Sequence, residues 1–473
     1  MFNNLIPALI ITPALFAILG FLFSKRAAFF GIAFGLIFFS ESLLLLYGVA
    51  TKSPWAYHFG GWQAPLGIAF APLRFGSSIL GVSAFVMLLT FIYARFSLQE
   101  SQRALFYPLS TFLALGLVVV YLSQDIFTIY VGLEIIGLCA VGLSALQKSP
   151  KALHASLVYL FSTLVASGFY LLGVAIIYAK YGLLNISALI PVIQEELPTL
   201  VAFGFMVVAF LLKTAVFPLS FWLANAHANA PTPVSALLSA LVIKATFYLM
   251  YLFAATLFIF EYELSYFLAF LGVGAIFYGG IKAYLSSDLK LLIAYSTISQ
   301  VGYLLLIFAF IDEHTDPSMA FNAMAFALFS HTLAKSGFFL AAGVVVHIAQ
   351  TKEISALQGY ASITPVSVFA IALSAVSLIG LPPSLGFVSK WYYLQSAYLS
   401  ESWFFLFAII GGGILSAAYL FKLLILFLEH PLEEGHLLRR EKSHTTLEWT
   451  AFTLSFLSVF LAFFSNSIIA FMG

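Results

Sequence analysis

Apolar runs of about 20 residues follow one another along this chain, and short polar stretches separate them. A helical run of that length crosses the ~30 Å hydrocarbon core of a bilayer. Helices and closed β-barrels are the only backbone forms that satisfy all their polar groups inside lipid. A barrel needs apolar and polar residues that alternate along each strand, and this sequence does not show that alternation. We therefore predict an all-α polytopic membrane protein.

The composition excludes several other classes of protein. Of the 473 residues, 62% are hydrophobic and only 8% are charged, whereas a soluble domain is about 25% charged. The formal net charge is +1 and there is no basic tract, which excludes a nucleic-acid partner. The single cysteine, Cys139, cannot form an intramolecular disulfide, and the histidines show no metal-ligand spacing. We expect no metal and no cofactor.

The apolar runs predict about fourteen membrane-spanning helices, of which the twelfth is broken. They cover residues 3–23, 28–49, 76–95, 106–123, 126–146, 154–179, 200–222, 233–258, 264–285, 289–311, 318–347, 363–398, 402–428 and 447–471. No segment rich in Gly, Ser or Pro divides the chain. We therefore predict one integral-membrane domain over residues 1–473.

The distribution of lysine and arginine predicts the orientation, because cytoplasmic loops are enriched in both. With the N-terminus outside, eleven of the 20 basic residues fall in inner loops and three in outer loops. The other six lie within or at the ends of predicted helices. We expect a multi-pass protein of the inner (plasma) membrane with both termini outside. The longest outer loop, residues 50–75, is expected to cap the outer face.

Six of the ionisable residues inside predicted helices are candidates for function, because a charge there costs about 2.5–3.5 kcal/mol and by default indicates function. They are Glu134, Lys213, Lys244, His331, Lys335 and Lys390. A lone lysine can instead snorkel to the interface, and we interpret Lys282 and Lys422, near inner helix ends, in that way. Glu41 is interpreted as a local polar contact. Glu134, Lys213, Lys244, His331 and Lys390 together are too many to be structural accidents.

Lysine is the informative residue type in this set. Burial favours the neutral amine and a nearby carboxylate favours the charged form, so a buried lysine with a movable partner can gain and lose a proton near neutral pH. Arginine stays charged, and the middle of these helices contains none. Glu134 is the only acid deep in the middle helices and is the expected counter-ion. This pattern favours proton relay over voltage sensing.

Proline interrupts two predicted helices close to these lysines. Pro218 follows Lys213, and Pro382 with Pro383 precedes Lys390. Irregular backbone at membrane depth occurs only inside protein or beside water, and paired broken helices indicate inverted repeats around a mid-membrane ion path. We therefore predict two inverted five-helix repeats. The expected divisions are 1–105 with the first three helices, 106–258 and 264–428 with the two repeats, and 447–471 with the last helix.

Segments around these residues resemble one known family, the antiporter-like membrane subunits of respiratory complex I, membrane-bound hydrogenases and Mrp-type Na⁺/H⁺ antiporters. In the family's order, the matching segments are Lys213-Thr-Ala-Val-Phe-Pro218, Ala226-His227-Ala-Asn-Ala-Pro231-Thr-Pro-Val-Ser-Ala236, Asp288-Leu-Lys290-Leu-Leu-Ile-Ala-Tyr-Ser296, His331-x-x-x-Lys335 and Gly380-Leu-Pro-Pro-Ser-Leu-Gly-Phe387. The Ala-Pro-Thr-Pro-Val-Ser-Ala and Asp-Leu-Lys stretches are the most specific of them.

The resemblance implies the same fold and assigns roles to individual residues. Glu134 and Lys213 match an ion pair that gates protonation. Lys244 and His331 match a central hydrophilic axis, and Lys390 matches the residue from which protons leave. Protons would then enter from the inside near Lys213 and Lys244 and leave on the outside near Lys390.

The chain departs from the family pattern at several positions. Ser220 and Ala224 stand where the family often has a histidine and a proline, so a relay role for that histidine is absent here. Leu133 stands where a tryptophan often precedes the glutamate, and Arg74 stands where an acidic residue is expected. A long lateral helix after the last span is also expected to be absent, which favours a short subunit of the Mrp D type or an inner subunit of complex I.

The expected function is a proton-translocating, antiporter-like subunit of a multisubunit membrane complex, with an Mrp-type monovalent cation/proton antiporter as the first choice. One alternative is a proton-pumping membrane subunit of a redox complex, related to complex I or a membrane-bound hydrogenase. Another is an inorganic-carbon uptake subunit. The expected partners are other membrane subunits, the lipid bilayer, protons, and Na⁺ or K⁺. The chain shows no redox or hydrolytic site of its own, so the sequence leaves open whether it is part of a redox-driven enzyme complex.

Overall fold

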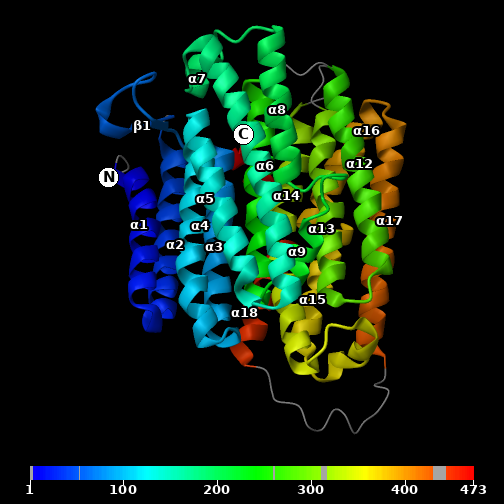
Figure 1. Ribbon diagram of the computed structural model, residues 1–473. Helices are drawn as coiled ribbons and strands as arrows, with labels where there is room; N and C mark the ends of the chain where they lie inside the picture. Colours follow the sequence, from blue (N-terminus) through cyan, green and yellow to red (C-terminus); the bar gives the residue numbers. More distant parts are fainter. Residues whose placement is uncertain (1–3, 53, 259–261, 311–316, 430–443, 473) are drawn as a thin grey trace.

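The computed structural model describes residues 4–52, 54–258, 262–310, 317–429 and 444–472. The helices stand side by side and run roughly in one direction, with both chain ends toward the upper end of the bundle (Figure 1). Within the described residues, twelve helices are long and apolar enough to cross a membrane, and two shorter apolar helices accompany them. The predicted all-α polytopic class is confirmed. Residues 430–443, which belong to the predicted inner loop between the last two spans, lie outside the described residues.

The helices of the first half of the chain follow the apolar runs closely. Their bounds are α1 Leu5–Leu22, α2 Ala27–Thr51, α3 Arg74–Ser97, α4 Glu100–Leu122, α5 Ile126–Ser144, α6 Pro150–Tyr181, α7 Ile186–Leu189, α8 Leu197–Lys213, α9 Leu223–Asn229, α10 Thr232–Leu237 and α11 Ile243–Thr256. In the expected outer cap, the short strands β1 (Tyr57–His58) and β2 (Ala69–Phe70) pair antiparallel. The cap is therefore a small hairpin between α2 and α3.

The second half of the chain forms the other side of the bundle. Its bounds are α12 Tyr262–Leu285, α13 Leu289–Leu305, α14 Pro317–Ala349, α15 Pro365–Ile379, α16 Leu385–Leu399, α17 Trp403–Leu428, α18 Thr445–Phe460 and α19 Ser465–Met472. The span over α10 and α11 and the one that begins with α13 are the most buried, whereas α1, α2 and the last span are mostly exposed. The core of the molecule therefore lies around α10, α11, α13 and α14.

The seventh predicted helix ends earlier than its sequence indicated. We expected it to run to residue 222, but α8 ends at Lys213, before Pro218. Ala215, with φ 57°, turns the backbone away from the helix. The Trp222 indole nitrogen donates to the Leu212 carbonyl (2.9 Å) and satisfies one backbone group of the last turn. Pro218 thus lies within the break and does not start it.

Two further departures from regular helix occur in the core. The predicted helix 233–258 is not continuous, because a π-helical turn at Leu238–Val242 separates α10 from α11. The predicted break in the twelfth span is present: α15 ends at Ile379, and α16 begins at Leu385, capped by Ser384. Gly380 adopts φ 86°, a left-handed conformation that a glycine tolerates at little cost. The break therefore contains Pro382 and Pro383, as predicted.

Two equivalent backbone couplings relate the halves of the chain. At the start of α5, Ile126 N donates to Leu184 O (2.9 Å) and Ile186 N donates to Gln124 O (2.7 Å). At the start of α13, the equivalent pairs are Leu289 N to Lys352 O and Ile354 N to Ser287 O, both 2.8 Å. The first coupling, beside α7, lies at the upper end of the bundle, and the second, after α14, lies at the lower end (Figure 1). This correspondence supports the expected inverted repeats, whose boundaries stay a prediction.

Helices α12 and α13 pack backbone against backbone. A Cβ on Gly302 would lie 2.3 Å from the Gly272 carbonyl oxygen, and a Cβ on Gly279 would lie 2.4 Å from Ser299 N. No real Cβ fits at such distances, so only glycine permits this approach. The contact fixes α13 firmly along the side of α12.

Candidate functional site

The predicted ion pair forms between α5 and α8. The Lys213 ammonium lies 3.6 Å from a Glu134 carboxylate oxygen. The same ammonium donates to the Thr163 hydroxyl (2.9 Å), and the Ser167 hydroxyl donates to Glu134. Thr163 and Ser167 are one turn apart on α6 and share a face. Each partner of the ion pair therefore has its own hydroxyl, and these two hydroxyls were missed by the sequence reasoning.

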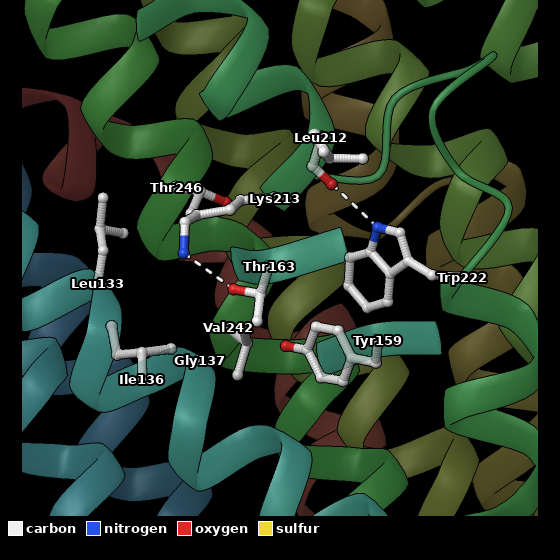
Figure 2. Close-up of a pocket in the computed structure, with 10 residues that line it drawn as sticks. All are labelled: Leu133, Ile136, Gly137, Tyr159, Thr163, Leu212, Lys213, Trp222, Val242 and Thr246. Carbon is white, nitrogen blue, oxygen red and sulfur yellow. Dashed lines mark hydrogen bonds between the residues drawn. The ribbon is translucent and has the colours of Figure 1, made fainter. Parts of the chain in front are cut away.

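A small pocket adjoins Lys213, and residues of α5, α6, α8 and α11 contribute to its walls (Figure 2). Its walls include Tyr159 and Trp222, whose rings are stacked 4.2 Å apart. Thr246 also lines it, and Thr246 accepts a hydrogen bond from the Thr214 hydroxyl (3.0 Å). The pocket thus lies between the ammonium of Lys213 and α11, the helix that carries Lys244.

Glu134 lies at the edge of the bundle. Its side chain is 23% exposed, against 6% for Lys213. Phe127, Val131 and Leu138 share its face of α5 and are 45%, 41% and 54% exposed. The sequence reasoning treated Glu134 as buried, so this position is a correction. One end of the ion pair faces lipid or a neighbouring protein.

Lys244 and Lys335 lie at the centre of the bundle and are fully buried. Lys244 donates to the carbonyl of Ser239, which belongs to the π-helical turn, and Lys335 donates to the Ile293 carbonyl (3.0 Å). The Ser239 hydroxyl bonds to the Thr297 hydroxyl (2.9 Å), which donates to the same Ile293 carbonyl (3.1 Å). These groups join Lys244 on α11 to Lys335 on α14 through α13.

Two buried histidines accompany the central lysines. Within the described part of the chain, neither ring nitrogen of His331 has a protein hydrogen-bond partner, and His227 Nδ1 has none either. Lys244, Lys335 and His227 all interact electrostatically with His331. Buried imidazole nitrogens of this kind are positioned to bond to water. His227, in the Ala-Pro-Thr-Pro segment of the resemblance, was not predicted as a site residue, although that segment contained the signal.

Lys390 lies beside the break between α15 and α16. Its ammonium donates to the carbonyls of Leu378 (3.2 Å) and Ile379 (2.7 Å), which the helix break frees, and lies 4.4 Å from the centre of the Tyr303 ring. Gln300 of α13 donates to the same Leu378 carbonyl (3.1 Å). Lys390 is thereby linked to α13, as the central lysines are.

One polar stripe on α13 joins the predicted residues. Ser296, Thr297 and Gln300 lie on one side of this helix; Ser296 contacts Lys335, Thr297 contacts Ser239, and Gln300 shares an acceptor with Lys390. These residues stand in an otherwise apolar run, which was the available signal. Three or more metal-ligating side chains do not cluster anywhere in the described segments.

The fold and this buried line of amines define a class: a polytopic membrane protein built around a polar axis. The family described as "NADH:quinone oxidoreductase/Mrp antiporter, TM" matches residues 123–416, and the chain belongs to that family. The resemblance stated from the sequence is therefore confirmed.

Individual relatives come from more than one kind of complex. The chain is 31% identical to the N subunit of an NADH-quinone oxidoreductase from Desulforudis audaxviator, over 85% of this chain and 80% of the relative. It is 27% identical to the D subunit of a Na(+)/H(+) antiporter from Alkalihalophilus pseudofirmus, over 89% and 86%. A solved chain in the Mrp complex from Dietzia sp. has the same fold, with a TM-score of 0.91 at 22% identity, covering 99% of this chain and 96% of that one.

Proposed function

We propose that this protein is a proton-translocating, antiporter-like subunit of a multisubunit membrane complex, and that the complex is an Mrp-type monovalent cation/proton antiporter. The observation that carries the proposal is the row of buried lysine side chains. Lys213, Lys244, Lys335 and Lys390 come from four different helices, and hydroxyl, amide and carbonyl groups connect the last three through α13.

The chemistry of these groups suits proton relay. A buried lysine can exist as amine or ammonium, and each form needs different neighbours. Here the ammonium groups bond to backbone carbonyls and hydroxyls, which stabilise charge without fixing it as a carboxylate would. His331 interacts electrostatically with both Lys244 and Lys335, and both of its ring nitrogens are able to bond to water. Protons would enter from the inside near Lys213 and Lys244 and leave on the outside near Lys390.

Opening and closing of the Glu134–Lys213 pair would control when Lys213 releases its proton to the relay. At 3.6 Å the two charges attract each other but do not form a close hydrogen bond. Separation of the pair would remove the carboxylate that favours the charged lysine, so a proton would pass toward Lys244. The pocket between Lys213 and α11 gives the side chain a direction in which to move.

The position of Glu134 supports a partner subunit. A carboxylate on a membrane-facing surface is costly unless protein or water covers it. Neighbouring side chains on α5 are large and apolar, as the interface with another membrane subunit requires. We propose that a further membrane subunit binds this face. We also propose that both chain termini lie on the outer side of the membrane.

The second candidate is a proton-pumping subunit of a redox complex. It is favoured by the 31% identity to a relative named for NADH-quinone oxidoreductase. The proton path proposed above would serve either machine, because the energy source lies in the partner subunits.

Gentle purification through a tag on this chain, followed by mass spectrometry of the intact complex, separates the two candidates. Small membrane subunits without iron–sulfur or flavin proteins would support the antiporter. Iron–sulfur, nickel or flavin subunits would replace it with the redox complex.

A second experiment tests the path itself. Lys213→Ala and Glu134→Gln should each abolish proton-coupled transport in inverted vesicles, whereas Lys282→Ala, at an exposed lysine of α12, should leave transport intact. Full transport by both Lys213→Ala and Glu134→Gln would refute the proposal.

A further inference from the structure

A cavity of about 780 Å³ lies at one end of the bundle, beside the turn that follows His227. Its lining comes from the ends of α3 and α14, the starts of α4, α6, α13 and α18, the turn between α9 and α10, and the segments before α6 and after α14. Four of the lining residues carry basic side chains. They are Lys151, Lys290, His347 and Lys352.

The polar lining of this cavity favours negative charge. Four amide side chains line it, and none of the described lining residues is an aspartate or glutamate. They are Gln99, Gln102, Gln147 and Asn229. Gln99 and Ser149 precede the first turns of α4 and α6, which are 23 and 32 residues long. The amino-terminal ends of long helices carry partial positive charge.

The carboxylate that acts on the lining is Asp288, which interacts electrostatically with Lys290, while Lys352 adds a second positive charge beside it. Asp288 caps α13 by accepting from Leu291 N (2.9 Å), and Glu353 accepts from the Ser355 hydroxyl (2.9 Å). Glu100 is exposed on α4 and does not line the cavity. The two innermost lysines reach only backbone oxygens: Lys352 donates to Ala228 O (2.9 Å), and Lys290 donates to Ala230 O. Among the described lining residues, the basic side chains therefore have no carboxylate within the cavity itself.

We propose that this cavity binds a phosphate-type oxyanion. Such a group accepts several hydrogen bonds at once and is matched by ammonium groups, amide N–H groups and helix starts. It would bridge α4 and α6 to the α9–α10 turn, which Lys290 and Lys352 already hold. The oxyanion is either free phosphate or the headgroup of an anionic phospholipid, which have the same chemistry. The cavity adjoins the central network, because Lys290 interacts electrostatically with His227.

Thermal unfolding of the tagged, full-length protein in its purified complex tests the proposal. Inorganic phosphate should raise the unfolding temperature in a saturable manner, beyond chloride at the same ionic strength, because a ligand of the folded state stabilises it. Phosphatidylglycerol added to neutral detergent, compared with phosphatidylcholine, tests the lipid source. Stabilisation in only one arm identifies which source supplies the oxyanion.

Two variants and a control assign any effect to the cavity. Lys151→Gln, at an exposed residue that makes no demand on the fold, and the double variant Lys151→Gln/Lys352→Gln should weaken apparent affinity about tenfold or more, the loss of one or two charge-assisted bonds. Lys148→Gln, at an exposed lysine outside the lining, should bind as the unchanged protein does. Equal responses to phosphate and chloride together with no effect of phosphatidylglycerol, or equal losses in Lys148→Gln and Lys151→Gln, would overturn the proposal.

Discussion

At the scale of single residues, the ion pair depends on its two hydroxyl groups. Thr163 bonds to Lys213 and Ser167 bonds to Glu134, so each charge keeps a partner when the two charges separate. A buried charge left without a partner costs far more than the bond that it loses. These hydroxyls would therefore lower the barrier to opening of the pair.

Thr163→Val tests this role, since valine keeps the shape and removes the hydroxyl. A hydrogen bond to a charged group contributes about 1.5–3 kcal/mol, so we expect proton-coupled transport to fall about tenfold or more. Transport would be measured in inverted vesicles at equal protein levels. The matched control is Ser162→Ala, whose hydroxyl bonds only to the Val158 carbonyl of its own helix (2.7 Å). Equal transport in both variants would contradict the role given to Thr163.

At the scale of helices, the function depends on where regular structure stops. The carbonyls that hold Lys390 are free because α15 ends at Ile379, and the carbonyl that holds Lys244 lies in a π-helical turn. Sequence reasoning placed most helix ends within a few residues, because apolar length and polar loops determine them. It placed the break after α8 at Pro218, whereas the helix already ends at Lys213. It missed the π-helical turn, because the backbone changes there among buried residues of unremarkable composition.

The site was predictable to a similar extent. Charged residues inside apolar runs stood out, so Lys213, Lys244 and Lys390 could be identified without coordinates. Serine and threonine do not stand out, because in a membrane helix they usually bond to the carbonyl one turn earlier. Thr297 makes that local bond and also contacts Ser239 across the helix interface, a difference that only the packing reveals.

Gly380→Ala tests the importance of the break before α16. An L-residue in the left-handed conformation costs about 1–2 kcal/mol, and the added Cβ would lie 2.7 Å from Lys390 Cδ. We expect a lower unfolding temperature and a loss of transport, because the ammonium would leave its two carbonyls. Gly168→Ala on α6 is the control, since its Cβ would meet nothing within 4 Å. An unchanged unfolding temperature and full transport in Gly380→Ala would show that this glycine is not required.

At the scale of the whole molecule, the exposed stripe around Glu134 predicts where a partner subunit binds. Leu138→Cys, made in a Cys139→Ala background, places one thiol on that stripe. Within the intact complex this thiol should react slowly with a membrane-permeant maleimide, whereas in the separated chain it should react readily. Labelling at the same rate in both states would place the partner elsewhere.

The glycine contact between α12 and α13 has a mechanical consequence. Helices in backbone contact cannot slide or rotate past each other without a clash. We therefore expect α12 and α13 to behave as one rigid unit. A lysine that bonds to α13, such as Lys335, would then move relative to a fixed helix. The movements that the proposed relay requires would then arise in the interrupted segments, α8 with α9 and α15 with α16.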